Sequence, residues 1–402
     1  MKKISIFNFS ALKIYPFYSG GAIIWLMKSE LLKKAGGFAK KNVVMLIALL
    51  LAAITCFFVP PDKDYLGYFD LRTLSCLLAT LAIVCALKNV NFFYFLAERT
   101  VKIFKTARSS VLALVYITFI GSMLIANDMA LLTFLPLGYI VLTNTKTEKY
   151  MIFTFVMQNV AANLGGMLTP FGNPQNLYLY SKFSIPTPEF MGIMIIPFAI
   201  SVLLITTCCL IFVKKEPIIF EGETAKPEPK RTALYLALFV LSVVMVFRVI
   251  PFLIGLPIIV VILLIADPKA LAKIDYPLLF TFAFFFIFAG NMARIETVRS
   301  FFSYLLGKNT LLFSVLSCQV ISNVPSAILL SQFTENYAPL LIGVNIGGVG
   351  TLISSLASLI TFREYCSHNP GKSGKYLGIF SAFNFSFLII LTGVMLLLGY
   401  LV

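Results

Sequence analysis

Long apolar stretches separated by short polar segments run along most of this chain. The first, about Asn42–Val59, lies between a lysine-rich segment and the acidic turn PPDKDYLGYFD, and the second covers about Leu71–Leu87. A helix of roughly 20 apolar residues crosses the hydrocarbon core of a bilayer, and the alternating strands of a membrane barrel are not found in this sequence. Because lipid cannot satisfy exposed backbone groups, the spanning segments must be helices. The pattern therefore predicts an all-α polytopic membrane protein.

The next apolar stretch, Ser109–Thr143, contains a single charged residue, Asp128, near its centre. A straight helix of this length, at ~1.5 Å per residue, would be too long for a hydrocarbon core of about 30 Å. The central sequence ANDM and the lysines that follow the stretch indicate that the chain enters the membrane, turns at Asn127 and returns. We expect a re-entrant helical hairpin here and a second one at Thr310–Thr334, which turns at SNVP.

Two other apolar stretches are interrupted by glycine, proline and asparagine. Met151–Ser181 contains NLGGMLTPFGNPQN, and Tyr337–Phe362 contains NIGGVGT. Gly and Pro weaken or end a helix, so each stretch should form two half-helices. The sequence predicts one broken transmembrane helix after each hairpin.

The remaining spans complete two halves of the chain. They are about Phe190–Val213, Thr232–Ile250, Leu256–Ala266, Asp275–Asn291 and Tyr376–Val402. We divide the sequence into an interfacial or extension segment (1–41), a first half (42–213, hairpin 109–143, broken helix 151–181), a cytoplasmic linker (214–231) and a second half (232–402, hairpin 310–334, broken helix 337–362). The basic loops predict a C-terminus outside the cell. Residues 1–41 lack a clear signal-peptide cleavage site, and Met27 is an alternative natural start.

The two halves contain the same features in the same order. The matched pairs are Asp70 with Asp275, the Asn127 tip with the Asn323 tip, and Asn163-x-Gly-Gly-x-x-Thr169 with Asn345-x-Gly-Gly-x-x-Thr351. In the topology set by the basic loops, the first copy begins outside the membrane and the second begins inside. The sequence therefore predicts two inverted repeats, an architecture common among secondary transporters.

Composition agrees with a membrane protein and narrows the function classes. The 402 residues are 59% hydrophobic and 12% charged, with a mean hydropathy of +0.93 and a formal net charge of +15. The basic residues lie in loops between apolar runs rather than on one face, so we do not expect nucleic-acid binding. The seven cysteines lie mostly inside apolar runs without C-x-x-C spacing, which indicates packing roles and no metal site.

The hairpin tips and broken helices together predict a binding site at bilayer depth. Unwound backbone there is tolerated only where it is buried in protein or lines a cavity. The positive ends of half-helices attract anions, and free carbonyl groups can hold a cation. Glycines alone could instead serve close helix packing. Their pairing with two polar hairpin tips favours the binding site.

Asp128 is the acidic residue placed deep in an uncharged run. Burial disfavours a charged carboxylate, so this group could take up and release a proton or bind a coupling cation. The alternative is that Asp128 caps the second arm of the hairpin by accepting the N–H of Ala130 or Leu131. The two roles are compatible.

Four segments resemble the hairpin and broken-helix motifs of the ion transporter superfamily: ANDMALLTFLP, LTPFGNPQN, SNVPSAILL and GVNIGGVGTLISSLASLI. This group includes divalent anion:sodium symporters, citrate–metal permeases and arsenite permeases, and the resemblance covers roughly residues 42–402. It implies a homodimer whose transport part moves as an elevator, with substrate held between the tips and the broken helices. The symporters' Ser-Asn-Thr tip corresponds here to Ala126-Asn127-Asp128 and Ser322-Asn323-Val324. The Asn-Asp tip is more similar to the arsenite and citrate–metal branch.

The candidate substrate- and ion-binding residues lie in these motifs. They are Asn127, Asp128, Asn163, Gly165, Gly166, Thr169, Gly172, Asn173, Asn176, Ser322, Asn323, Asn345, Gly347, Gly348, Thr351, Ser354 and Ser355. The resemblance also matches Pro174 and Ser358. We expect Arg294 and Arg299 to be boundary residues and His368 to lie in a solvated loop.

We expect a secondary active transporter of a small anion, a di- or tricarboxylate, coupled to protons or sodium in the inner (plasma) membrane. Arsenite or antimonite efflux and cation/proton antiport are the alternatives, with Asp128 as the proton partner. An enzyme would need paired acids, a nucleophile with its base, or a metal cluster at depth. A channel fits inverted repeats poorly, and the sequence has no phosphate-binding G-x-x-x-x-G-K-[ST] motif of an ATP-driven pump. No cofactor is expected.

Overall fold

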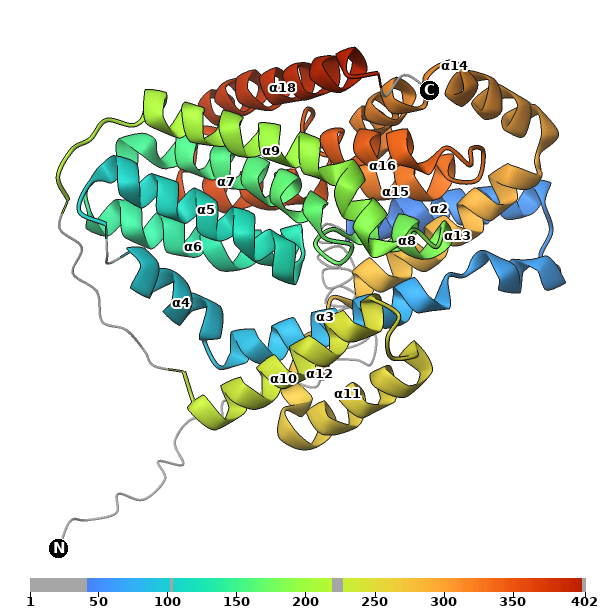
Figure 1. Ribbon diagram of the computed structural model, residues 1–402, viewed down its shortest axis with the longest axis horizontal. Helices are drawn as coiled ribbons and strands as arrows, with labels where there is room; N and C mark the ends of the chain where they lie inside the picture. The colour runs from blue at the N-terminus through green and yellow to red at the C-terminus, as the bar shows by residue number, and fades with distance from the viewer. Residues whose placement is uncertain (1–41, 102–103, 219–226, 400–402) are drawn as a thin grey trace, which may run out of the picture.

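The computed structural model describes residues 42–101, 104–218 and 227–399, and this part of the chain is helical with no β-strand (Figure 1). Eight of its helices are long and apolar enough to cross a membrane, and three shorter apolar helices accompany them. The predicted all-α polytopic class is therefore confirmed. The expected N-terminal segment, with the alternative start at Met27, lies outside the described residues.

The helices follow the predicted apolar stretches. In the first half they are α2 (Val43–Phe58), α3 (Leu71–Asn89), α4 (Phe92–Val101), α5 (Ala107–Ile125), α6 (Asn127–Asn144), α7 (Met151–Gly165), α8 (Pro174–Lys182) and α9 (Thr187–Phe212), with the 3-10 helices η1 (Lys63–Tyr68), η2 (Glu148–Tyr150) and η3 (Gly166–Leu168). In the second half they are α10 (Pro229–Val246), α11 (Phe252–Ala266), α12 (Pro268–Ala272), α13 (Tyr276–Arg294), α14 (Glu296–Ile321), α15 (Asn323–Leu330), α16 (Tyr337–Ile346), α17 (Leu356–His368) and α18 (Ser373–Leu397).

Local caps explain where several of these helices begin. Asp70 accepts the N–H of Thr73 at 3.0 Å before α3, and Asp275 accepts the N–H of Leu278 at 3.1 Å before α13. Within α14, Asn309 has a non-helical backbone, and its side chain accepts the N–H of Leu312 at 2.8 Å. This internal cap starts the first arm of the second hairpin at Thr310.

The helices pack as a hairpin-containing layer against a second group of helices (Figure 1). In the first, α5 packs on α6 and α7, α14 packs on α15 and α16, and α9 and α18 cover α7. In the second, α2 lies along α13, and α10 and α11 pack on α3. The two halves of the chain interlock, because α17 packs on α6 and α7 whereas α8 packs on α15 and α16. This exchange brings both hairpin tips and both broken helices to the centre.

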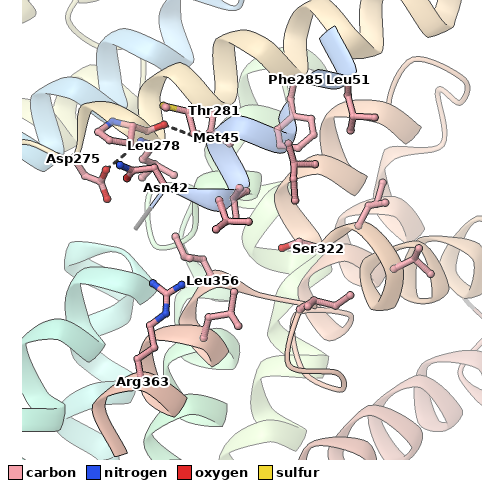
Figure 2. A pocket seen from close by; sticks show the side chains of 18 residues that line it. Asn42, Met45, Leu51, Asp275, Leu278, Thr281, Phe285, Ser322, Leu356 and Arg363 are labelled. Atoms are coloured by element: carbon pink, nitrogen blue, oxygen red, sulfur yellow. Dashed lines mark hydrogen bonds between the residues drawn. The ribbon is translucent and has the colours of Figure 1, made fainter. Parts of the chain in front are cut away.

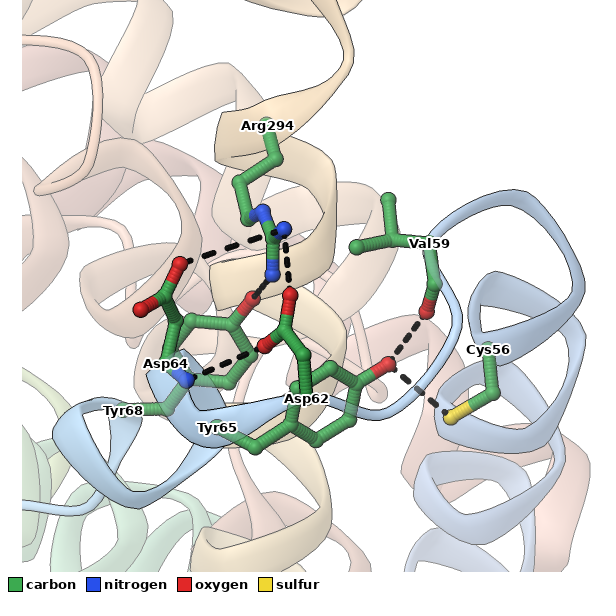
Figure 3. A network of polar contacts seen from close by, with 7 residues as sticks. All are labelled: Cys56, Val59, Asp62, Asp64, Tyr65, Tyr68 and Arg294. Atoms are coloured by element: carbon green, nitrogen blue, oxygen red, sulfur yellow. Dashed lines mark hydrogen bonds and ion pairs between the residues drawn. The ribbon is translucent and has the colours of Figure 1, made fainter.

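Arg294, at the end of α13, joins the two halves at the α2–α3 loop (Figure 3). Its guanidinium lies 2.6 Å from a carboxylate oxygen of Asp62 and donates to the hydroxyl of Tyr68 at 3.1 Å. The hydroxyl of Tyr65 donates to the carbonyl of Val59 in the same loop. Arg294 therefore anchors a loop, at the end of its helix as expected.

Candidate functional site

The two hairpins turn through the same unusual backbone conformation. Ala126 joins α5 to α6 with φ 65° and ψ 150°, and Ser322 joins α14 to α15 with φ 77° and ψ 159°. Positive φ is uncommon for residues other than glycine. The next residue is Asn in both tips, and the side-chain oxygens of Asn127 and Asn323 each accept the N–H of the residue that follows at 2.9 Å. The turn therefore directs one helix N-terminus from each hairpin toward the centre.

The two broken helices also have matching geometry. The first arms stop at Gly166 and Gly347, whose φ and ψ values are −63° and −10° in one and −63° and −12° in the other. The second arms start from extended residues, Asn173 with φ −131° and ψ 142° and Ser355 with φ −150° and ψ 143°. Each broken helix thus presents a new N-terminus, that of α8 or α17, to the tips.

A threonine fastens each broken helix to the hairpin of its own half. The hydroxyl of Thr169 donates to the carbonyl of Met123 at 2.8 Å, and that of Thr351 donates to the carbonyl of Gln319 at 3.1 Å. Each acceptor lies four residues before the asparagine of its tip. These two candidate residues therefore position the unwound segments, and neither is in the wall of the two cavities described below.

The tips are held by different neighbours. Asn127 donates to the side-chain oxygen of Asn163 at 3.3 Å, which ties the first tip to the end of α7. The backbone N–H of Asn323 donates to the carbonyl of Ser354 at 2.9 Å, and the Ser354 hydroxyl donates to the carbonyl of Gly348 at 3.0 Å. The second tip is thus joined to the unwound part of its broken helix.

A layer of buried amides connects the two broken helices. Asn173 donates to the carbonyl of Asn163 and to the side-chain oxygen of Asn345, both at 3.1 Å. Asn345 in turn donates to the side chain of Asn176 at 2.6 Å. All four side chains are buried. Since buried polar groups are costly unless paired, this network fixes the two unwound segments relative to each other.

Glycine is required where the unwound segments approach other groups. A Cβ atom at Gly166 would lie 2.3 Å from the side-chain oxygen of Asn173, and one at Gly348 would lie 3.1 Å from the side-chain nitrogen of Asn323. Similarly close contacts occur at the other candidate glycines, which are Gly165, Gly172 and Gly347. Gly165 and Gly347 contact the first arms of the hairpins, so they serve helix packing there.

A small cavity of about 40 Å³, the tip cavity, lies where these elements meet. The candidate residues that line it are Asn127, Asp128, Ser322, Asn323 and Ser355, together with Pro174. The N-termini of α6, α8, α15 and α17 all open onto it, because the first residue of each helix is in its wall. The positive end of the helix dipole favours a negative group at such a place.

Asp128 is the one charged residue in the wall of the tip cavity within the described part of the chain. Of the two N–H groups considered as its capping partners, that of Ala130 donates to the carbonyl of Ala126 instead. One oxygen of Asp128 is buried without a hydrogen-bond partner, as are the side-chain oxygens of Asn173 and Gln175. Such acceptor oxygens suit a proton or a small cation.

Residues outside the two repeat motifs complete the wall. Val44 of α2 and Leu278 and Thr281 of α13 line the tip cavity. Sequence reasoning missed these residues, because an apolar helix gives no sign of which face it turns toward a site. Gln319 was also missed, although its amide donates to the carbonyls of Gly347 and Val349 in the unwound segment. The placement of a Gln four residues before a tip was the available signal.

A larger cavity of about 500 Å³ adjoins the tip cavity (Figure 2). The two cavities share five lining residues, which are Val44, Leu278, Thr281, Ser322 and Leu356. The larger one lies between α2 and α13 on one side and the second hairpin and α17 on the other. It therefore gives the tip cavity a route toward the end of α13 where Asp275 lies.

Comparison with known proteins adds a family relationship. Residues 23–340 match the family described as citrate transporter. An uncharacterized transporter of Methanocaldococcus jannaschii is 34% identical over 311 residues, which cover 76% of this chain and 84% of that protein. The inner membrane protein YbiR of Escherichia coli K12 is 28% identical over 319 residues, which cover 76% of this chain and 83% of that protein.

Proposed function

Because this chain belongs to the citrate transporter family, we propose that it is a secondary active transporter of a di- or tricarboxylate. The observation that carries the proposal is the meeting of four helix N-termini at the tip cavity. Together with the amides and hydroxyls of Asn127, Asn323 and Ser355, they provide N–H and O–H donors for carboxylate oxygens. The unwound segments let the backbone itself take part in binding.

A carboxylate substrate must enter the tip cavity together with one or more cations. The described wall of the tip cavity contains Asp128 and no Lys or Arg, so a bare polycarboxylate would meet an acid without a cationic partner. Protons, sodium ions or a divalent cation bound to the carboxylate would each remove this repulsion. We assign the coupling role to Asp128, because its unpaired oxygen can accept a proton or bind a cation.

Transport requires that the tip cavity open alternately to the two sides of the membrane. The tip cavity is bounded by both the hairpin-containing layer and the pair α2 and α13, so sliding of one against the other would change its access. An elevator-type movement in a homodimer, as the superfamily resemblance implies, meets this requirement. The protein would act in the inner (plasma) membrane with its C-terminus outside.

A second candidate function is arsenite or antimonite efflux, or cation/proton antiport. The Asn-Asp tip and the lack of a basic residue in the described cavity wall support it, because a neutral or cationic cargo needs no cationic partner. The four helix N-termini favour the carboxylate over these ligands.

Uptake by proteoliposomes separates these functions. Labelled citrate, succinate and arsenite would be supplied under separately imposed sodium and proton gradients, with and without Mg²⁺. Gradient-driven carboxylate uptake would support the first function, and dependence on Mg²⁺ would identify a metal complex as the cargo. Arsenite movement without carboxylate movement would replace it with the second.

A further inference from the structure

Two opposite charges lie in the wall of the larger cavity. Asp275 caps α13, and Arg363 is on the second turn of α17; both line this cavity (Figure 2). In the close-up, the guanidinium of Arg363 points toward the side on which Asp275 lies. The same two helices contribute residues that line both cavities, Leu278 of α13 and Leu356 of α17, so the two charges lie along a wall that continues into the tip cavity.

The two charged groups are separate from each other. Neither forms an ion pair within 4.0 Å in the described part of the chain, and Arg363 makes no side-chain hydrogen bond there. Both residues are exposed. Arg363 is therefore available to a solute that enters the cavity.

Most of the remaining wall is apolar and offers few competing partners. It includes Val43, Ile47, Phe285, Val320 and Leu359. Low-dielectric walls concentrate the field of the charges that they contain, so a cavity of this kind raises the local concentration of one sign of ion. Asp275 and Arg363 therefore have more influence on an ion in this cavity than they would on a flat surface.

We propose that Arg363 contacts a carboxylate of the substrate in the larger cavity and that Asp275 opposes it, so that the pair selects the charge of the solute that reaches the tip cavity. This inference rests on the proposed carboxylate function. The planar guanidinium can bind a carboxylate through two parallel hydrogen bonds. Asp275 keeps this contact weak enough for the substrate to move on, since a transported ion must leave each site that it visits. The basic loops predict that the end of α13 at Asp275 is on the cytoplasmic side.

The test compares two substitutions that should change the Michaelis constant for citrate in opposite directions. Citrate flux would be measured from the cytoplasmic side in inside-out vesicles that contain the full chain. Arg363→Gln should raise KM about tenfold with little change in kcat, and Asp275→Asn should lower KM by about threefold. Asn remains a good helix cap at position 275. Arg363→Lys should restore part of the loss, and all effects should shrink at high ionic strength.

Two matched variants serve as controls. Asp70→Asn alters the corresponding cap of α3, and Arg299→Gln removes an exposed arginine; neither residue lines the larger cavity. Both should leave KM from the cytoplasmic side unchanged.

Suppose that the wild type transports citrate. If Asp275→Asn and Arg363→Gln then change KM in the same direction, or leave it unchanged, this inference alone is overturned. Absence of carboxylate flux in the wild type would overturn the proposed function and this inference with it. Transport of a cationic substrate in place of citrate, with both KM changes reversed in sign, would overturn the carboxylate assignment.

Discussion

The two hairpin tips have the same backbone and different chemistry. Ala126 and Ser322 share a positive φ, and the Asn after each accepts the N–H of the residue that follows it at the same distance. The next position differs, with Asp128 in the first tip and Val324 in the second. The duplicated geometry thus supplies helix N-termini from both sides, whereas the charge is supplied from one side only.

This difference separates two parts of the site. Features present in both copies, such as the tip Asn and the threonine contact to the hairpin, build the shape of the tip cavity. A feature present once, the Asp128 carboxyl, can respond to a proton or cation without changing that shape. We therefore expect equivalent substitutions of a shared feature in the two copies to have similar effects. Substitution of Asp128 should have an effect that substitution of the equivalent residue, Val324, does not have.

The largest paired effect is expected at the tip asparagines. Asn127→Ala and Asn323→Ala each remove the acceptor for a partly buried backbone N–H, and leaving such a group unsatisfied costs up to about 1–3 kcal/mol. Each variant should lower the rate of citrate uptake by up to about 100-fold. Initial rates in proteoliposomes would measure this. A loss confined to one tip would show that the copies do not contribute equally.

The unpaired effect is expected at Asp128. Asp128→Asn removes the titratable group and keeps its size, so uptake driven by a proton gradient should fall at least about tenfold while citrate exchange across equal concentrations continues. Val324→Asn, at the equivalent place in the other tip, is the matched control and should retain driven uptake. Equal loss of driven uptake and exchange in Asp128→Asn would indicate a role in substrate binding and not in coupling.

Much of this arrangement follows from local sequence signals. The ANDM and SNVP turns, and the Gly-Gly phrases of the broken helices, interrupt apolar stretches at points where only a turn or an unwound segment is compatible with the residues. The structure has its turns at Ala126 and Ser322 and its interruptions after Gly165 and Ile346. The all-helical class needed no more than hydropathy and length.

The packing between distant segments could not be predicted in the same way. Nothing local in α13 indicates that Thr281 faces the tips, and the roles of Thr169 and Thr351 depend on carbonyl groups far away in the chain. The sequence places these two threonines among the binding residues, which stays a prediction, and the structure adds that their hydroxyls donate to carbonyl groups of the hairpins. The inverted orientation of the copies and the homodimer stay predictions, because no membrane or partner subunit takes part in the geometry described.

A smaller paired effect is expected at these threonines. Thr169→Val and Thr351→Val each remove one hydroxyl contact to a hairpin and should lower stability by about 1 kcal/mol, the usual size for a hydrogen bond between helices in a membrane protein. Thermal unfolding in detergent would measure the change. Thr80→Val is the control, because its hydroxyl donates to a carbonyl of its own helix and joins no other element. Unequal losses would show that one broken helix is held mainly by other contacts.

The smallest effect concerns the ion pair that joins the two halves outside the site. The hydrogen bond from Arg294 holds the pKa of Asp62 below its ordinary value, although both groups are exposed. A carboxyl whose pKa is lowered on folding contributes stability above its unfolded pKa of about 3.9 and loses it as the pH falls through the lower folded value. The wild type should therefore unfold at a slightly higher temperature than Asp62→Asn at pH 6 to 8, and this difference in unfolding temperature should vanish in strong acid. Thermal unfolding across this range would measure it, with Asp64→Asn as the control at 3.9 Å from the same guanidinium. A large loss of stability in Asp62→Asn at neutral pH would mean that the packing of the two halves depends on this loop contact. That result would contradict the small contribution expected of exposed ion pairs.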